Sequence, residues 1–200
     1  MNGEASRAGK IIVVVAQLAL QSARGAARVE QMRLQARRAL QYSADESGAE
    51  LGALAKDAND VPLPSNGWHW SLSHCPTHVA AAVHRAPLGV DVESRRDVKP
   101  ELVERVLTPV ERELLTQGGE PAFLRGWTAK EAVLKELGLG LGGLSRCTIV
   151  DCEPEGLVVE CDGHRRHVRQ LAGRERIVAV SSRDDAQVEW RDLAGIGVRP

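Results

Sequence analysis

Apolar residues first gather in a short β-branched run near the start of the chain. Residues 11–15 are all isoleucine or valine, and a turn-like segment over residues 22–25 follows soon after, which is typical of a buried strand. Arg7 and Lys10 precede the run, so the alternative is the hydrophobic segment of a signal peptide. Because the run is short and is interrupted by Gln17, it cannot span a bilayer.

Apolar spacings along the rest of the chain predict an α+β protein. Further strands are expected over residues 68–72, 78–84, 88–93, 148–150, 157–161, 167–171 and 176–181, and helices over 29–40, 109–115 and 121–137. Thr108 and Glu111 predict a capping box at the start of the second helix, and Asp162-Gly163 predicts a hairpin turn. Because strands dominate and helices are few, we expect antiparallel sheets.

The same pattern divides the chain into two halves. A loop over residues 61–67, with two prolines, an asparagine and a glycine, separates a basic helical segment from a short meander of strands. Arg85-Ala86-Pro87 then joins two of those strands. We expect an N-terminal α+β half over residues 1–87 and a C-terminal α+β half over residues 88–200.

Composition narrows the classes of function. Of the 200 residues 43% are hydrophobic, which is enough to build a core and argues against disorder. The 26 basic and 27 acidic residues leave a net charge of −1, so no overall field holds the protein on DNA or on an anionic membrane. One Phe and one Tyr offer few stacking platforms for bases. We therefore expect no nucleic-acid or membrane partner.

Two carboxylates leave one face of the predicted strand over residues 88–93. The alternation there is strict, so Leu88, Val90 and Val92 point to one side while Asp91 and Glu93 point to the other. Paired carboxylates suit a hard divalent cation such as Mg²⁺. The alternative is an ordinary solvated strand face.

The third predicted helix carries a second charged stripe. Trp127, Glu131 and Lys135 are spaced at i, i+4 and i+8, so a ring, a carboxylate and an ammonium share one edge. A plain Glu131–Lys135 helix salt bridge would explain the same spacing. We expect Lys130, next to this stripe, to face solvent.

A third candidate functional site lies where a predicted strand enters a turn. Ser73 and His74 bring a hydroxyl and an imidazole to a corner that ends at Cys75 and Pro76. Such a corner can hold a phosphate, and a surface histidine is the alternative. The G-x-S-x-G spacing of a hydrolase does not accompany it.

The cysteines give two further readings. Cys75, Cys147, Cys152 and Cys161 show no close pairing, so we expect buried free thiols in a reduced cytoplasmic protein. The alternative is a zinc site made by the last three cysteines with His164.

Together, three of these motifs resemble those of the 4′-phosphopantetheinyl transferase family. Its members share a serine-histidine corner, a (V/I)-G-(V/I)-D-(V/I)-E strand and a W-x-x-K-E-(A/S)-x-x-K helix. Here Leu72-Ser73-His74, residues 89–93 and residues 127–135 match them in that order. The resemblance covers about residues 60 to 182.

The resemblance implies an activity and a set of roles. Such enzymes move the phosphopantetheine arm of coenzyme A onto a serine of an apo acyl or peptidyl carrier protein and release adenosine 3′,5′-bisphosphate. The implied Mg²⁺ ligands are Asp91, Glu93 and Glu131, with Glu131 also the base, Lys135 on the phosphate, and Ser73 and His74 at the coenzyme A 3′-phosphate. Trp127 is expected to pack and to position its helix. Length favours the larger, monomeric type, whose two similar halves are related by a pseudo-twofold axis. The pathway, whether fatty-acid, polyketide or nonribosomal-peptide synthesis, is left open.

Departures from the family pattern keep a second reading open. Where the family has G-K-P, this chain has Asp60-Val61-Pro62, so a phosphate-binding lysine is missing from that position. The N-terminal half is also shorter than usual, and Arg33, Arg37 and Arg38 are the candidates there for contacts to coenzyme A. The same arginines would alternatively steer an acidic carrier or form a solvated helix face. The alternative function is a non-catalytic relative that binds carrier protein or coenzyme A.

Overall fold

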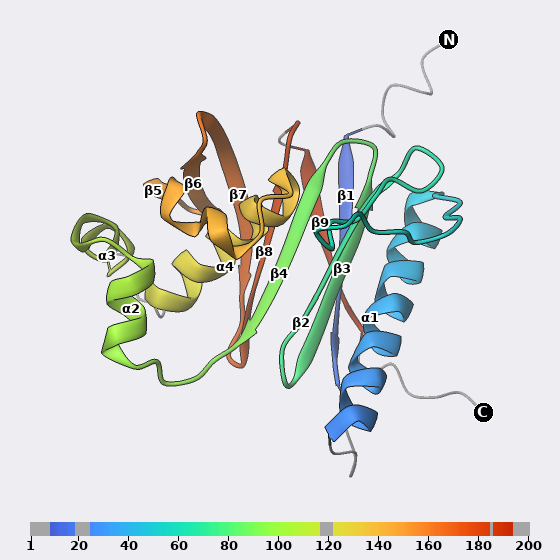
Figure 1. The fold of residues 1–200 in the computed structure, drawn as a ribbon, viewed down its shortest axis with the longest axis horizontal. Coiled ribbons are helices and arrows are strands. Elements are labelled where there is room, and N and C mark those ends of the chain that lie inside the picture. Colours follow the sequence, from blue (N-terminus) through green and yellow to red (C-terminus); the bar gives the residue numbers. More distant parts are fainter. Residues whose placement is uncertain (1–8, 19–24, 117–121, 185, 194–200) are drawn as a thin grey trace.

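The structure is a computed structural model that describes residues 9–18, 25–116, 122–184 and 186–193 (Figure 1). Its helices are α1 (Gly25–Ser47), α2 (Pro100–Val106), α3 (Pro109–Thr116), α4 (Ala122–Leu137) and the 3₁₀ helix η1 (Leu141–Arg146). Its strands are β1 (Lys10–Gln17), β2 (His69–His74), β3 (His78–His84), β4 (Leu88–Ser94), β5 (Cys147–Glu153), β6 (Gly156–Cys161), β7 (His164–Ala172), β8 (Arg176–Ser182) and β9 (Gln187–Leu193). No described helix has the length and apolar character needed to cross a membrane.

The first sheet has the strand order β2-β3-β1-β9 and is covered on one face by α1 (Figure 1). Ser43 of α1 donates its hydroxyl proton to the Ile12 carbonyl oxygen, 2.7 Å away, and accepts the Val83 N–H at 3.0 Å. One buried hydroxyl therefore ties the helix to two strands. Strands β1 and β9 run parallel, so the expectation of purely antiparallel sheets is wrong at this edge.

The second sheet has the order β4-β8-β7-β6-β5 and is antiparallel throughout. Helix α4 packs on one face, with Leu124, Ala129 and Val133 in a core that also holds Leu157 and Ile177. Helices α2 and α3 lie beyond α4 on the side away from the first sheet (Figure 1). The mixed fold with largely antiparallel sheets agrees with the predicted α+β class.

Strand β4 is the edge strand of the second sheet that packs against the first sheet, and it positions the candidate carboxylates. Leu88, Val90 and Val92 are buried in a core shared with β1 and β8. The predicted alternation is confirmed, because Asp91 and Glu93 therefore point to the opposite face, toward α4. Both carboxylates thus leave the sheet where the helix crosses it.

Several sequence predictions are corrected at their boundaries. The apolar run near the start of the chain forms β1, which is buried along most of its length. Within the described residues this contradicts the signal-peptide alternative. Helix α1 is longer than residues 29–40, and α2 and β9 were not predicted. Arg7, the segment 22–24 and the predicted helix start at Pro121 lie outside the described residues.

The cysteine prediction is wrong for one pair. Cys147 and Cys161 form a disulfide, because they are direct partners in the antiparallel β5–β6 pairing. Cys75 and Cys152 are free. The zinc alternative is also contradicted, since two of its four ligands are bonded to each other.

Candidate functional site

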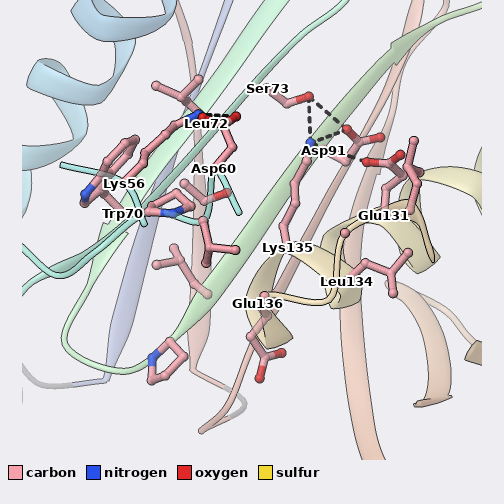
Figure 2. A pocket seen from close by; sticks show the side chains of 18 of the residues that line it. Lys56, Asp60, Trp70, Leu72, Ser73, Asp91, Glu131, Leu134, Lys135 and Glu136 are labelled. Carbon is pink, nitrogen blue, oxygen red and sulfur yellow. Dashed lines mark hydrogen bonds and ion pairs between the residues drawn. The ribbon is translucent and has the colours of Figure 1, made fainter. Parts of the chain in front are cut away.

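A cavity of about 540 Å³ lies where β2 of the first sheet meets β4 and α4 (Figure 2). Its walls come from the loop over residues 56–62, from β2, from β4 and from α4. All three predicted motifs contribute side chains: Ser73 and His74 from β2, Asp91 and Glu93 from β4, and Trp127, Glu131 and Lys135 from α4. The motifs that are far apart in the sequence thus meet at one site.

Lys135 is the centre of the polar contacts in this cavity. Its ammonium lies 2.7 Å from Asp91 Oδ1, 3.1 Å from Ser73 Oγ and 3.7 Å from Glu131 Oε2 (Figure 2). Ser73 also donates to Asp91 Oδ1 at 2.8 Å. The Asp91 side chain is only 6% exposed and that of Lys135 is 31% exposed, so water screens this pair less than it screens a fully exposed salt bridge. The plain Glu131–Lys135 helix pair is therefore only one part of a larger network.

Glu93 is held by Trp127 and by a nearby arginine. The Trp127 indole N–H donates to Glu93 Oε1 at 3.2 Å, and Arg96 donates to Glu93 Oε2 at 3.3 Å. The indole also stacks on Phe123 with ring centroids 6.0 Å apart. The predicted packing role of Trp127 is confirmed, and its hydrogen bond orients a candidate metal ligand as well.

The three carboxylates repel one another. Burial raises the pKa of Glu93, and the Asp91 charge raises it further. Burial also raises the pKa of Glu131, as do the charges of Asp91 and Glu93, while Lys135 opposes the shift. Such crowding disfavours the ionised forms until a cation enters.

The donor set fits a hard divalent cation. Asp91 Oδ2 is buried and has no hydrogen-bond partner within the described chain, and an unpaired buried carboxylate oxygen is costly unless another group binds it. Carboxylate oxygens are the ligands that Mg²⁺ prefers. Among the described residues no three His, Cys, Asp or Glu side chains are already gathered around one point. In this structure the Lys135 ammonium contacts the carboxylates of Asp91 and Glu131 instead.

The predicted coenzyme A contacts fall in two places. His74 lines the cavity beside Ser73, and burial lowers its pKa, with Lys135 and Arg33 contributing in that order. Arg33 and Arg37 are exposed on α1 and are not among the residues that line the cavity. Arg33 nevertheless lies close enough to act electrostatically on His74.

Lys130 does not face solvent, so that prediction is wrong. Its ammonium is buried and donates to Glu111 Oε1 at 2.7 Å and to the Val106 carbonyl oxygen at 2.9 Å. Glu111 also accepts the N–H of Ile149 at 2.7 Å and of Thr108 at 2.8 Å. The signal in the sequence was the helical spacing, which puts Lys130 on the same face as apolar neighbours three and four positions away.

Lys56 is a cavity residue that the sequence did not identify. It lines the wall formed by the loop over residues 56–62, and its ammonium pairs with Asp60 Oδ2 at 2.8 Å. No motif marked it, because a lone lysine in an acidic stretch has no distinctive spacing.

A comparison with known protein families finds a match for residues 87–181. The matching sequence profile is described as the 4′-phosphopantetheinyl transferase superfamily. That range includes the carboxylates and Lys135 but not Ser73, His74 or Lys56.

Three relatives share parts of the chain. The 4′-phosphopantetheinyl transferase psf-1 of Bacillus pumilus is 36% identical over 91 residues, which are 43% of this chain and 38% of that protein. Enterobactin synthase component D of Escherichia coli K12 is 37% identical over 70 residues, 32% of this chain and 34% of that protein. A 4′-phosphopantetheinyl transferase of Bacillus subtilis is 28% identical over 106 residues, 50% of this chain and 46% of that protein. The chain thus covers less than half the length of each relative.

Proposed function

We propose that the chain is a member of the 4′-phosphopantetheinyl transferase superfamily, whose profile residues 87–181 match, and that it modifies carrier proteins. The serine hydroxyl oxygen of an apo acyl or peptidyl carrier attacks the phosphorus that bears the pantetheine arm of coenzyme A. The bond from that phosphorus to the bridging oxygen breaks, and adenosine 3′,5′-bisphosphate leaves. The carrier gains the arm as a phosphodiester.

The observation that carries this proposal is the meeting of Asp91, Glu131 and Lys135 at one end of the cavity. Lys135 Nζ lies 2.7 Å from Asp91 and 3.7 Å from Glu131. Phosphoryl transfer depends on positioning and on charge compensation more than on covalent chemistry by the protein. A cluster of carboxylates with one ammonium supplies both.

Asp91, Glu93 and Glu131 would hold Mg²⁺ at this end of the cavity. The unpaired Asp91 Oδ2 and the mutual repulsion of the carboxylates support this assignment. When bound, Mg²⁺ neutralises charge on the phosphoryl oxygens and helps to orient the leaving group.

The side chains of the chain itself do the remaining work. Glu131 accepts the proton of the carrier serine as its oxygen attacks. Lys135 offsets negative charge on the leaving phosphate, and its contact with Ser73 Oγ keeps the ammonium aimed into the cavity. We assign His74 and Ser73 to the 3′-phosphate of coenzyme A, with Arg33 adding long-range attraction.

Intact-mass spectrometry of the carrier tests the proposal. An apo carrier incubated with the protein, coenzyme A and Mg²⁺ gains the mass of one phosphopantetheine arm, and Glu131→Gln or removal of the metal abolishes the gain. No mass gain on several carriers, with folded protein that still binds coenzyme A, would favour the non-catalytic relative instead.

Peptidyl carriers are the first substrates to test. One relative is named as a component of enterobactin synthase, and this name directs attention to carriers of peptide synthases. Acyl carriers of fatty-acid and polyketide synthesis complete the panel, because every such carrier presents a comparable serine.

We further propose that the two halves, residues 1–87 and 88–200, act as one monomer with a pseudo-twofold relation. Each half has a sheet with a helix packed on it, α1 in the first and α4 in the second (Figure 1). Strand β9 pairs with β1, which ties the end of the second half back to the first sheet. Size-exclusion chromatography with light scattering tests the monomer.

A further inference from the structure

The cavity contains a second charged pair, separate from the carboxylate cluster. Lys56 and Asp60 form an ion pair of 2.8 Å between Nζ and Oδ2, and Figure 2 shows it on the side of the cavity away from Glu131. Both residues line the cavity. The transfer chemistry proposed above uses neither of them.

The loop that carries this pair is ordered by its own hydrogen bonds. Asp57 Oδ1 accepts the N–H groups of Asn59 and Val61 at 2.8 and 2.9 Å, and the Asp57 N–H donates to the Val61 carbonyl oxygen at 2.9 Å. Lys56 and Pro62 also form an isolated β-bridge. The loop therefore presents the Lys56 ammonium from a defined backbone.

The loop also reaches the second half of the chain. A Cβ built on Gly138, just past the end of α4, would lie 3.2 Å from a methyl group of Val61. The loop and the end of α4 therefore close one wall of the cavity together. Lys56 thus lines the cavity from a wall that both segments form.

Lys56 is the cation in the cavity that can exchange partners. Among the described lining residues the ammonium and guanidinium groups are those of Lys56 and Lys135, and Lys135 is already held by Asp91, Ser73 and the Val90 carbonyl oxygen. The side chains of Lys56 and Asp60 are 40% and 83% exposed, so their ion pair is weak. A phosphate carries more charge than a carboxylate and accepts stronger hydrogen bonds.

We propose that Lys56 binds a phosphate group of the ligand's nucleotide end and that Asp60 is the resting partner which this phosphate displaces. The identity of the ligand as coenzyme A rests on the proposed function. The carboxylate cluster takes the reacting end, and Lys56 anchors the other. Asp60 thereby weakens ligand binding.

Calorimetric binding of adenosine 3′,5′-bisphosphate and of adenosine 5′-monophosphate tests the role of Lys56. We expect Lys56→Ala and Lys56→Gln to weaken bisphosphate binding about tenfold. Lys99→Ala is the matched control, because Lys99 is exposed, lies outside the cavity and makes no side-chain cap on α2. A loss in both nucleotides assigns Lys56 to the 5′ phosphate, and a loss in the bisphosphate alone assigns it to the 3′ phosphate. Equal affinities for the Lys56 variants and Lys99→Ala would overturn the proposal.

Asp60→Asn tests the exchange of partners. Asp60 has a φ of 66°, a left-handed conformation that asparagine also tolerates, so the loop keeps its shape. We expect bisphosphate binding to tighten about threefold, and we expect this gain to vanish in the Lys56→Ala background. A gain of equal size in both backgrounds would mean that Asp60 only repels the ligand, which would overturn the exchange.

These measurements are separate from the transfer reaction. Nucleotide binding needs no carrier and no turnover, so a protein without transferase activity would still show the Lys56 dependence. If the protein transfers the arm normally and Lys56→Ala binds nucleotide like the control, the proposed function stands and only the phosphate-binding role of Lys56 is overturned.

Discussion

Gly89 of β4 lies directly beneath the backbone of Ala132 in α4. A Cβ built on Gly89 would be 1.9 Å from the Ala132 carbonyl oxygen and 2.6 Å from the Glu136 backbone nitrogen. Helix and strand therefore meet at backbone distance, which only glycine permits here. This close approach brings Lys135 within hydrogen-bond distance of Asp91, two residues further along the strand.

Gly89→Ala should therefore damage both stability and activity. The added methyl group forces α4 away from β4, and we expect a loss of about 1–3 kcal/mol in the free energy of unfolding. Because Glu131 and Lys135 move with the helix, transfer should fall by about a hundredfold. Urea unfolding and a transfer assay measure the two effects.

The control is Gly142→Ala. A Cβ on Gly142 meets no atom within 4 Å, and this residue is not among the glycines with positive φ. Gly142→Ala should leave both quantities unchanged. If Gly89→Ala behaved like Gly142→Ala, the close packing of α4 on β4 would not matter for the site.

Local patterns were sufficient to predict which side chains share a face within β4 and within α4, but not that Asp91 and Lys135 meet across 44 residues. The strict alternation over residues 88–93 put Asp91 and Glu93 on one face, and helical spacing put Glu131 and Lys135 on one edge. The capping box was equally local: Glu111 N–H donates to Thr108 Oγ1 at 3.2 Å, and Glu111 Oε2 accepts the Thr108 N–H. Each of these arrangements depends on residues less than ten positions apart.

Long-range pairing explains what the sequence did not reveal. Strand β9 has its place because it pairs in parallel with β1, more than 170 residues earlier. The Cys147–Cys161 bond depends on the register of β5 against β6, and Lys56 becomes a cavity residue only because its loop packs near the end of α4. Nothing in the neighbouring residues specifies these contacts.

The buried Lys130–Glu111 pair should be a major contributor to stability. Both side chains are almost fully buried, at 3% and 1% exposure, and removing one partner leaves an uncompensated buried charge. We expect Lys130→Met to lower the free energy of unfolding by about 3–5 kcal/mol. The double variant Lys130→Met/Glu111→Gln should recover part of that loss, as urea unfolding will measure.

Arg165→Met provides the surface comparison for this pair. Arg165 pairs with Glu160 at 2.8 Å, but the two side chains are about half exposed. Its removal should change the free energy of unfolding by less than about 1 kcal/mol. A Lys130→Met effect of the same small size would show that the buried network contributes little.

Glu111 of the buried pair also makes the stability of the folded protein depend on pH. Burial opposes ionisation of Glu111, but hydrogen bonds from Lys130, Ile149 and Thr108 outweigh it and hold the pKa below the ordinary value of 4.5. The unfolded chain therefore binds this proton more readily than the folded one. The contribution of Glu111 is present above pH 4.5 and is lost as the pH falls through the lower folded pKa.

Unfolding free energies measured in urea between pH 7 and pH 3 test this dependence. Glu111→Gln should lose less stability on acidification than the parent protein, because glutamine does not titrate. Glu93 and Glu131 have raised pKa values, but they are present in both proteins and drop out of the difference. Parallel curves for the two proteins would contradict the prediction.

The disulfide should stabilise the second sheet by restricting the unfolded chain. Cys147 and Cys161 are 14 residues apart, and closing a loop of this size contributes about 3 kcal/mol in the chain-entropy description. Reduction, or Cys147→Ser with Cys161→Ser, should lower the free energy of unfolding by about that amount. Cys152→Ser is the matched control, because Cys152 is free. Alkylation of the urea-unfolded protein checks the bond directly: Cys75 and Cys152 react before reduction, and all four cysteines react after it. Four labels without reduction would show that the bond is absent.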